Sequence, residues 1–263
     1  MGLFCRVGLE GCPIEKLIEV HQVTYSYVSP AAPVIKNLSL QISRGQFVSI
    51  VGPSGCGKST LFKLAAGLLE PESGTILLNG RDGSRLGRVA YMPQQDLLLP
   101  WKTVLANCLL PVVVRRGDRK RARETALRML ERFGLGERVN AYPDELSGGM
   151  RQRAALLRTL MHGGELLLLD EPFGALDAMT KREMHGWLLP LLGELNLTVL
   201  FITHDLEEAV LLSDRVLVMP ASPGKPVKEL HIDLPKPRTT AAVFTSRSQE
   251  LRAELEGMLY ARE

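Results

Sequence analysis

One short segment constrains the fold of this chain more than any other. Residues Gly52–Thr60 satisfy the pattern G-x-x-x-x-G-K-[ST]. They follow the apolar run Gln46–Val51, which is typical of a buried strand, and precede Leu61–Leu69, which is typical of a helix. A strand, a glycine-rich loop and a helix in this order predict a phosphate site, because backbone N–H groups then converge at a helix N-terminus. The alternative, a glycine-rich turn with a solvated lysine, is disfavoured by this context.

The chemistry of such a loop assigns roles to its residues. Lys58 would reach the β- and γ-phosphates of a nucleotide, and Ser59 would be a ligand of Mg²⁺. The glycines allow the backbone to wrap a phosphate without clashes of Cβ atoms. The predicted nucleotide-binding loop therefore comprises Gly52, Pro53, Ser54, Gly55, Cys56, Gly57, Lys58, Ser59 and Thr60.

Two acidic residues can supply the carboxylates that a nucleotide-hydrolysing site needs besides the loop. The run Leu166–Leu169 is continuously apolar and ends in Asp170 and Glu171. Mg²⁺ needs further oxygen ligands, and attack by water on a γ-phosphate needs a positioned carboxylate. We expect Asp170 to hold the metal and Glu171 to orient and activate the water. Alone, the pair could equally be an ordinary transition from strand to loop.

Composition excludes several classes of protein. The chain has 263 residues, of which 45% are hydrophobic and 23% are charged, so we expect one large globular domain with an insertion. Its net charge of +3 does not by itself indicate a nucleic-acid partner. The most apolar window, Leu97–Val114, is interrupted by Pro100 and Lys102, so no membrane-spanning helix is expected. The N-terminal stretch Met1–Val20 lacks the continuous apolar run of a signal peptide, so we do not expect secretion.

The cysteines, at positions 5, 12, 56 and 108, form no C-x-x-C pair. This spacing is typical of free thiols in a reducing compartment and gives no support for a zinc site.

Hydrophobic periodicity divides the chain into alternating elements. We expect half-buried antiparallel strands at Leu17–Tyr27 and Val34–Ile42, and further strands at Gly74–Asn79 and Arg88–Met92. Later apolar runs predict fully buried parallel strands at Glu165–Asp170, Leu197–Ile202 and Arg215–Met219.

Helical patterns fill the space between these strands. An inserted group of helices is expected at Thr103–Arg116, Arg119–Phe133 and Gly148–His162. A further helix is expected over Ala178–Glu194, with a kink or break at Pro190, and a last one over Val243–Tyr260.

The segment Leu146–Arg153 decides among nucleotide-binding proteins. Its sequence Leu-Ser-Gly-Gly-Met-Arg-Gln-Arg closely resembles the LSGGQ signature of ATP-binding cassette (ABC) ATPases, with Met where Gln is usual. Ser147, Gly148 and Gly149 open a helix, where a hydroxyl, free N–H groups and the helix dipole can meet a phosphate. An ordinary capped helix is the alternative. The resemblance implies a head-to-tail pair of cassettes that binds ATP at two shared sites.

Other landmarks of the ABC family follow in order. Gln94 resembles the glutamine that contacts Mg²⁺ and water, Asp177 in Ala175–Asp177 resembles the D-loop aspartate near the partner's site, and His204 resembles the histidine that contacts the γ-phosphate. Gln95 is a rival for Gln94, which we favour because it lies six residues before Pro100. Tyr27 resembles the aromatic residue that stacks on adenine, and Tyr25 is its rival.

A finer resemblance concerns direction of transport. Residues Gln94–Asn107 are similar to a segment of importers for nitrate, sulfonate, taurine and related solutes, and Leu234–Arg238 resembles an L-P-R-P-R element of the same ATPases. The resemblance implies an ATP-hydrolysing importer subunit that works with Mg²⁺, a second copy of itself, permease subunits and, indirectly, an extracytoplasmic solute-binding protein. It would lie peripherally at the cytoplasmic face of the inner membrane.

The resemblance also implies the architecture. We expect an α/β P-loop NTPase (RecA-like) core with an antiparallel β subdomain and an inserted α-helical subdomain. The expected division is a tail at 1–16, core and β subdomain at 17–98, helical subdomain at 99–158, core at 159–225 and extension at 226–263.

The alternatives are an ABC-type ATPase that acts in export, one that acts on nucleic acid or the ribosome, and a non-catalytic binding module. A basic run between Arg115 and Arg123 is compatible with nucleic-acid binding. The chain, however, lacks the coiled-coil or zinc insertions that ABC-type ATPases acting on DNA or ribosomes usually carry. A solvated helix face explains the run better, so no nucleic-acid partner is expected. A non-catalytic role is disfavoured because every motif residue is present.

Overall fold

The computed structural model describes residues 15–28, 32–174, 176–195 and 197–260. Most of the expected N-terminal tail, with Cys5 and Cys12, lies outside the described residues. Within them Cys56 and Cys108 are buried free thiols. No helix in the described part of the chain is both long and apolar enough to span a membrane.

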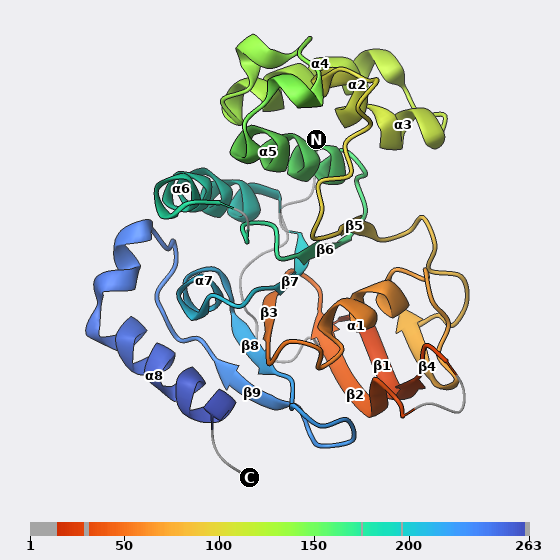
Figure 1. The fold of residues 1–263 in the computed structure, drawn as a ribbon, viewed down its shortest axis with the longest axis vertical. Helices are drawn as coiled ribbons and strands as arrows, with labels where there is room; N and C mark the ends of the chain where they lie inside the picture. The colour runs from red at the N-terminus through yellow and green to blue at the C-terminus, as the bar shows by residue number, and fades with distance from the viewer. Residues whose placement is uncertain (1–14, 29–31, 175, 196, 261–263) are drawn as a thin grey trace.

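The centre of the molecule is a six-stranded sheet in the order β5-β6-β7-β3-β8-β9 (Figure 1). Strands β5, β6, β7, β3 and β8 run parallel, as predicted for β6, β7 and β8, and β9 pairs antiparallel with β8. The sequence reading missed β9, although its residues belong to the expected C-terminal extension. The bounds are β3 Phe47–Val51, β5 Ala90–Met92, β6 Leu166–Asp170, β7 Thr198–Ile202, β8 Arg215–Val218 and β9 Lys228–His231.

Alternation along β6 shows how the sheet is covered on both faces. Leu167 and Leu169 pack into one core with helices α2 (Val104–Cys108), α4 (Arg119–Arg132), α5 (Gly148–Leu160) and α6 (Ala178–Leu195). Leu166 and Leu168 pack into another core with α1 (Lys58–Ala65) and a second sheet. Burial on both faces explains why the predicted strand is a continuous apolar run.

The second sheet has three antiparallel strands in the order β2-β1-β4. Its strands are β1 Lys16–Tyr25, β2 Ile35–Ser43 and β4 Ser73–Leu78. This sheet lies beside α1, which spans Lys58–Ala65 (Figure 1). The expected antiparallel β subdomain is therefore confirmed.

A group of helices projects at one end of the molecule (Figure 1). The expected helix over Thr103–Arg116 is wrong, because a turn at Leu109 divides it into α2 and α3. Pro111 has no N–H group to donate to the carbonyl of Asn107, so one continuous helix would lose a hydrogen bond there. The group comprises α2 Val104–Cys108, α3 Leu110–Val114, α4 Arg119–Arg132, α5 Gly148–Leu160 and the 3₁₀ turns Gly136–Arg138 and Pro143–Glu145.

Helix α6 runs from Ala178 to Leu195 without interruption and contains Pro190. Of the expected kink or break at Pro190, the break is therefore wrong. Both Pro190 and Gly186, four residues earlier, are exposed, so water can satisfy the carbonyl group that loses its helical partner.

Helix α8 Ser246–Tyr260 packs with α7 Leu206–Leu212 and strand β8 in a third core. The predicted last helix starts later than expected, because residues Thr240–Phe244 form a 3₁₀ turn instead. Arg238 is buried, and its guanidinium donates to the carbonyl groups of Leu211, Ser213, Ile232 and Leu234. These bonds fasten the segment after β9 to the end of α7.

Candidate functional site

The predicted phosphate loop connects the buried strand β3 to helix α1. Gly55 and Gly57 have φ angles of +80° and +99°, a region that side chains disfavour. Gly57 caps α1, and a Cβ atom there would lie 3.1 Å from the carbonyl oxygen of Val34. This loop conformation therefore requires glycine, and it leaves N–H groups at the start of α1 for a bound anion.

Lys58 is the first residue of α1, directly after the loop, and is only 9% exposed. Its ammonium donates to the carbonyl groups of Gly52 and Pro53, at 2.8 Å in each case. The loop thus holds a positive charge close to its own N–H groups, and phosphate oxygens can accept from this ammonium as the carbonyl oxygens do.

Asp170 lies at the end of β6, next to Ser59 of α1. The Ser59 hydroxyl donates to Asp170 Oδ1 at 3.2 Å, and Asp170 is 3% exposed. Burial raises the pKa of Asp170 above its ordinary value, and the charge of Glu171 adds to this shift, although Ser59 and Lys58 oppose it.

These groups fit Mg²⁺. A hydroxyl, a carboxylate and the amide oxygen of Gln94 are hard oxygen ligands, and Mg²⁺ in nucleotide sites completes its shell with water and phosphate oxygens. The described residues contain no cluster of three or more His, Cys, Asp or Glu that could form a metal site without a nucleotide.

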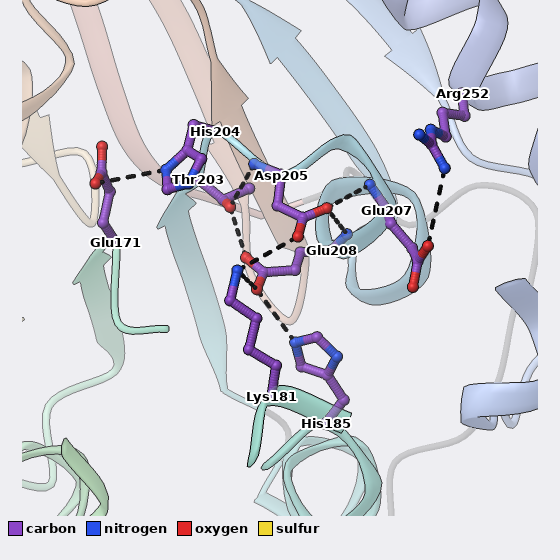
Figure 2. A network of polar contacts seen from close by, with 9 residues as sticks. All are labelled: Glu171, Lys181, His185, Thr203, His204, Asp205, Glu207, Glu208 and Arg252. Carbon is purple, nitrogen blue, oxygen red and sulfur yellow. Dashed lines mark hydrogen bonds and ion pairs between the residues drawn. The ribbon is translucent and has the colours of Figure 1, made fainter. Parts of the chain in front are cut away.

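Two loops, which carry Gln94 and His204, approach the carboxylate of Glu171. Gln94 Nε2 donates to Glu171 Oε2 at 2.9 Å. Nδ1 of His204 lies 3.6 Å from the same oxygen (Figure 2). Glu171 itself has a φ angle of +48°, which is uncommon for a residue with a side chain and typical of strained functional positions. This convergence supports Gln94 over Gln95.

Tyr27 lies beside the phosphate loop. Its hydroxyl is 3.1 Å from the Thr60 hydroxyl, and the residue is 53% exposed. Tyr25 packs edge-on against Tyr27, with ring centroids 5.2 Å apart, and contributes to the core. Tyr27 therefore presents a ring that a base can cover, whereas Tyr25 packs inward.

The structure places the remaining predicted residues elsewhere. Ser147 caps α5 by accepting from the N–H of Met150 at 3.3 Å, and Gly148 and Gly149 begin that helix, which belongs to the helical group at the far end from α1 (Figure 1). A Cβ atom on Gly149 would lie 3.0 Å from Thr180 in α6, so these two helix N-termini are neighbours. The signature residues at the start of α5 thus form a group separate from the residues around the phosphate loop.

Asp177 caps α6. Its carboxylate accepts from the N–H groups of Met179 and Thr180 and from the hydroxyl of Thr180, which holds its pKa below the ordinary value. Ala175, at the start of the predicted D-loop, lies outside the described residues.

The sequence reading missed Tyr91 in β5. Burial, together with the nearby charge of Asp170, raises the pKa of Tyr91. Its position three residues before Gln94, in an expected strand, was the available signal.

The sequence pattern of the ABC transporter family matches residues 35–174, which include the phosphate loop, Gln94, the signature segment and Glu171. The chain belongs to the ABC transporter family.

Two named relatives of this ABC transporter chain are importer subunits. The formylaminopyrimidine import ATP-binding protein ThiZ of Halalkalibacterium halodurans is 41% identical over 94% of this chain and 97% of its own length. The aliphatic sulfonates import ATP-binding protein SsuB 1 of Burkholderia cenocepacia is 46% identical over 89% of this chain and 72% of its own length. The expectation of an importer ATPase is thereby confirmed.

Solved structures that resemble this chain belong to the same family. The dimeric structure of MJ0796, a bacterial ABC transporter cassette, aligns with a TM-score of 0.73 and 31% identity over 83% of this chain and all of that chain. A dimeric post-hydrolysis state of MJ0796 bound to ADP and Pi aligns equally well, with 30% identity and the same coverage of both chains. The expected P-loop NTPase fold and ATPase activity are confirmed.

Proposed function

We propose that this chain hydrolyses Mg²⁺–ATP to energise uptake of a small solute, such as a sulfonate, taurine or nitrate, through a separate inner-membrane permease. The observation that carries this proposal is the convergence of Gln94, Glu171 and His204 beside a phosphate loop whose Ser59 contacts Asp170. The names of the relatives support uptake rather than export.

In this proposal each residue acts on a part of ATP that its position suits. The phosphate-loop N–H groups and Lys58 bind the β- and γ-phosphates, and Ser59, Asp170 and Gln94 would hold Mg²⁺. When bound there, Mg²⁺ would supply positive charge that offsets the charge of the phosphates. Glu171 accepts a hydrogen bond from the attacking water and takes its proton, while His204 binds the γ-phosphate.

The separation of the signature residues from the phosphate loop supports a dimer. The hydroxyl and N–H groups at Ser147, Gly148 and Gly149 can bind a γ-phosphate held by a second, head-to-tail copy, with Asp177 beside that shared site. A dimeric arrangement is known for the MJ0796 cassette. We propose that ATP closes this pair and that hydrolysis reopens it.

Replacing Tyr27 by Ala is expected to weaken ATP binding by about 5- to 100-fold, because loss of one base–aromatic stack costs about 1–3 kcal/mol. ADP affinity should fall by the same factor, since both nucleotides share adenine. Calorimetric titration checks this, with Tyr27→Phe as the matched control that keeps the ring. Parental affinity in Tyr27→Ala would exclude Tyr27 from base binding.

Exposed apolar side chains in residues 97–114 suggest where the permease docks. Leu97 is 56%, Trp101 70% and Val114 78% exposed. The loop that carries Leu97 is fastened to the signature helix α5, because Arg158 donates to the carbonyl groups of Asp96 and Leu97 at 2.5 and 2.6 Å. A permease bound here would therefore contact a segment linked to both Gln94 and α5.

Replacing Trp101 by Ala should lower permease-dependent uptake by about tenfold or more, because a buried interface tryptophan typically contributes ~2 kcal/mol or more. ATP hydrolysis by the chain alone should not change. Uptake into vesicles that contain the permease checks this, with exposed Leu86→Ala as control. Parental uptake with Trp101→Ala would place the permease elsewhere.

The wider assembly follows from the same proposal. A permease would place this chain peripherally at the cytoplasmic face of the inner membrane, and an extracytoplasmic binding protein would deliver the solute. Binding assays with that protein would identify the solute, because the ATPase does not contact it. We further propose residues 99–158 as the helical subdomain that contacts the permease.

A further inference from the structure

The loop that carries His204 is held by its neighbours rather than by His204 itself. The His204 side chain is 61% exposed, and it approaches Glu171 at 3.6 Å. Thr203, by contrast, is 2% exposed, and its hydroxyl donates to Glu208 Oε2 at 2.6 Å while accepting from the N–H of Asp205 at 3.0 Å. One hydroxyl thus fixes the backbone on both sides of the histidine (Figure 2).

Glu208 places a carboxylate at a buried position of α7, where packing alone would favour an apolar side chain. It is 3% exposed, and its carboxylate lies 3.4 Å from Lys181 Nζ and 3.5 Å from His185 Nε2. Among the residues that the structure describes, neither Glu208 Oε1 nor His185 Nε2 has a hydrogen-bond partner. A buried carboxylate is costly unless it is paired, so an apolar side chain would serve better if this position only filled space.

The contacts of Glu208 join two functional segments. Lys181 and His185 lie one turn apart on α6, the helix that Asp177 caps beside the signature residues. Burial lowers the pKa of Lys181, but the charges of Glu208 and Asp205 outweigh this and hold its pKa above the ordinary value. The ammonium of Lys181, which belongs to α6, therefore stays charged beside the His204 loop.

We propose that Glu208 is a positioning residue, which fixes the His204 loop through Thr203 and ties that loop to helix α6 through Lys181 and His185. This inference rests on the proposed function, because it gives His204 a role in hydrolysis. Glu208 itself need not touch ATP, since its effect on the reaction passes through the placement of His204.

The test is single-turnover hydrolysis of labelled Mg²⁺–ATP by the full chain in excess over nucleotide. Thr203→Val removes the hydroxyl at nearly constant volume, and Glu208→Gln removes the charge. Each should lower the hydrolysis rate by about 10- to 100-fold, the loss expected when a reacting group is misplaced by about 1 Å. ATP affinity should stay within about twofold, because neither residue lies in the phosphate loop.

Three further variants separate positioning from a general loss of structure. Thr203→Ser keeps the hydroxyl and should restore the parental rate, and Glu207→Gln changes the exposed neighbour and should have no effect. In a His204→Ala background, Thr203→Val and Glu208→Gln should cause no further loss beyond about twofold, because coupled groups are non-additive. The thermal unfolding temperature of each variant is measured alongside its hydrolysis rate, to show that the variant is folded.

The outcomes distinguish the two claims. If the parental chain does not hydrolyse ATP, the proposed function fails. If it does and His204→Ala is slow, yet Thr203→Val and Glu208→Gln react at the parental rate or lose the same factor in both backgrounds, the positioning role is wrong. The inference also fails if His204→Ala reacts at the parental rate. Should Thr203→Val not fold, Glu208→Gln and Thr203→Ser decide by the same criteria.

Discussion

Glu171→Gln is expected to slow ATP hydrolysis by about 100- to 10,000-fold, the usual contribution of a general base. Glutamine cannot accept the proton of the attacking water, although it can keep the hydrogen bond from Gln94, which is 2.9 Å in the parental chain. The phosphate loop is unchanged, so ATP should bind with parental affinity. Single-turnover hydrolysis and calorimetric titration measure the two effects separately.

The same substitution should stabilise a dimer in the presence of ATP, because the nucleotide that joins the two copies is no longer cleaved. Light scattering after gel filtration should show twice the monomer mass with ATP and monomer with ADP. Glu250→Gln, an exposed change on α8, is the matched control. A Glu171→Gln variant that hydrolysed ATP at the parental rate would remove Glu171 from its proposed role.

Lys58→Ala is expected to weaken ATP binding by about 100-fold or more. The ammonium would form hydrogen bonds to charged phosphate oxygens, and bonds of this kind contribute about 1.5–3 kcal/mol each. The parental lysine also bridges the carbonyl groups of Gly52 and Pro53 at 2.8 Å, so its removal loosens the loop as well. Calorimetric titration with ATP provides the measurement.

Lys228→Ala, on the exposed side of β9, is the control for loss of one positive charge. It should bind ATP as the parental chain does. Unchanged ATP affinity in Lys58→Ala would contradict the assignment of the phosphate loop.

The candidate site could be proposed from the sequence because its chemistry lies in short local patterns. The phosphate loop and the run ending in Asp170 and Glu171 each carry their meaning within a few residues, and the burial of β3 and β6 on both faces appears as continuous apolar runs. Two ambiguities, Gln94 against Gln95 and Tyr25 against Tyr27, needed the structure, because neighbouring residues share one local pattern.

Other features depended on contacts that local patterns do not contain. β9 is an edge strand of four residues, of which only Leu230 is buried, so its sequence lacks an apolar run. Glu207 and Glu208 are adjacent and chemically identical, yet one is 40% exposed at its side chain and the other 3%. Glu208 lies 3.4 Å from Lys181 and 3.5 Å from His185 on α6, whereas Glu207 pairs with Arg252 on α8, so contacts between segments far apart in the chain distinguish the two residues.

The predicted effects of proline on helix continuity were wrong for a related reason. At Pro111 the chain turns between two helices, whereas at Pro190 helix α6 continues. Both prolines lack the N–H group, so proline alone does not determine the outcome. At Pro190 the helix face is exposed and water can replace the lost bond, which is information that only the folded chain supplies.

Phosphate release from ATP by the purified parental chain, measured as its concentration is raised, decides whether this chain is an ATPase that works as a pair. An ATPase built from two head-to-tail copies should release phosphate only with Mg²⁺, and the rate per chain should rise with concentration until the pair is saturated. Release no faster than that of Lys58→Ala, at any concentration and with Mg²⁺ present, would contradict the assignment of this chain as a transport ATPase.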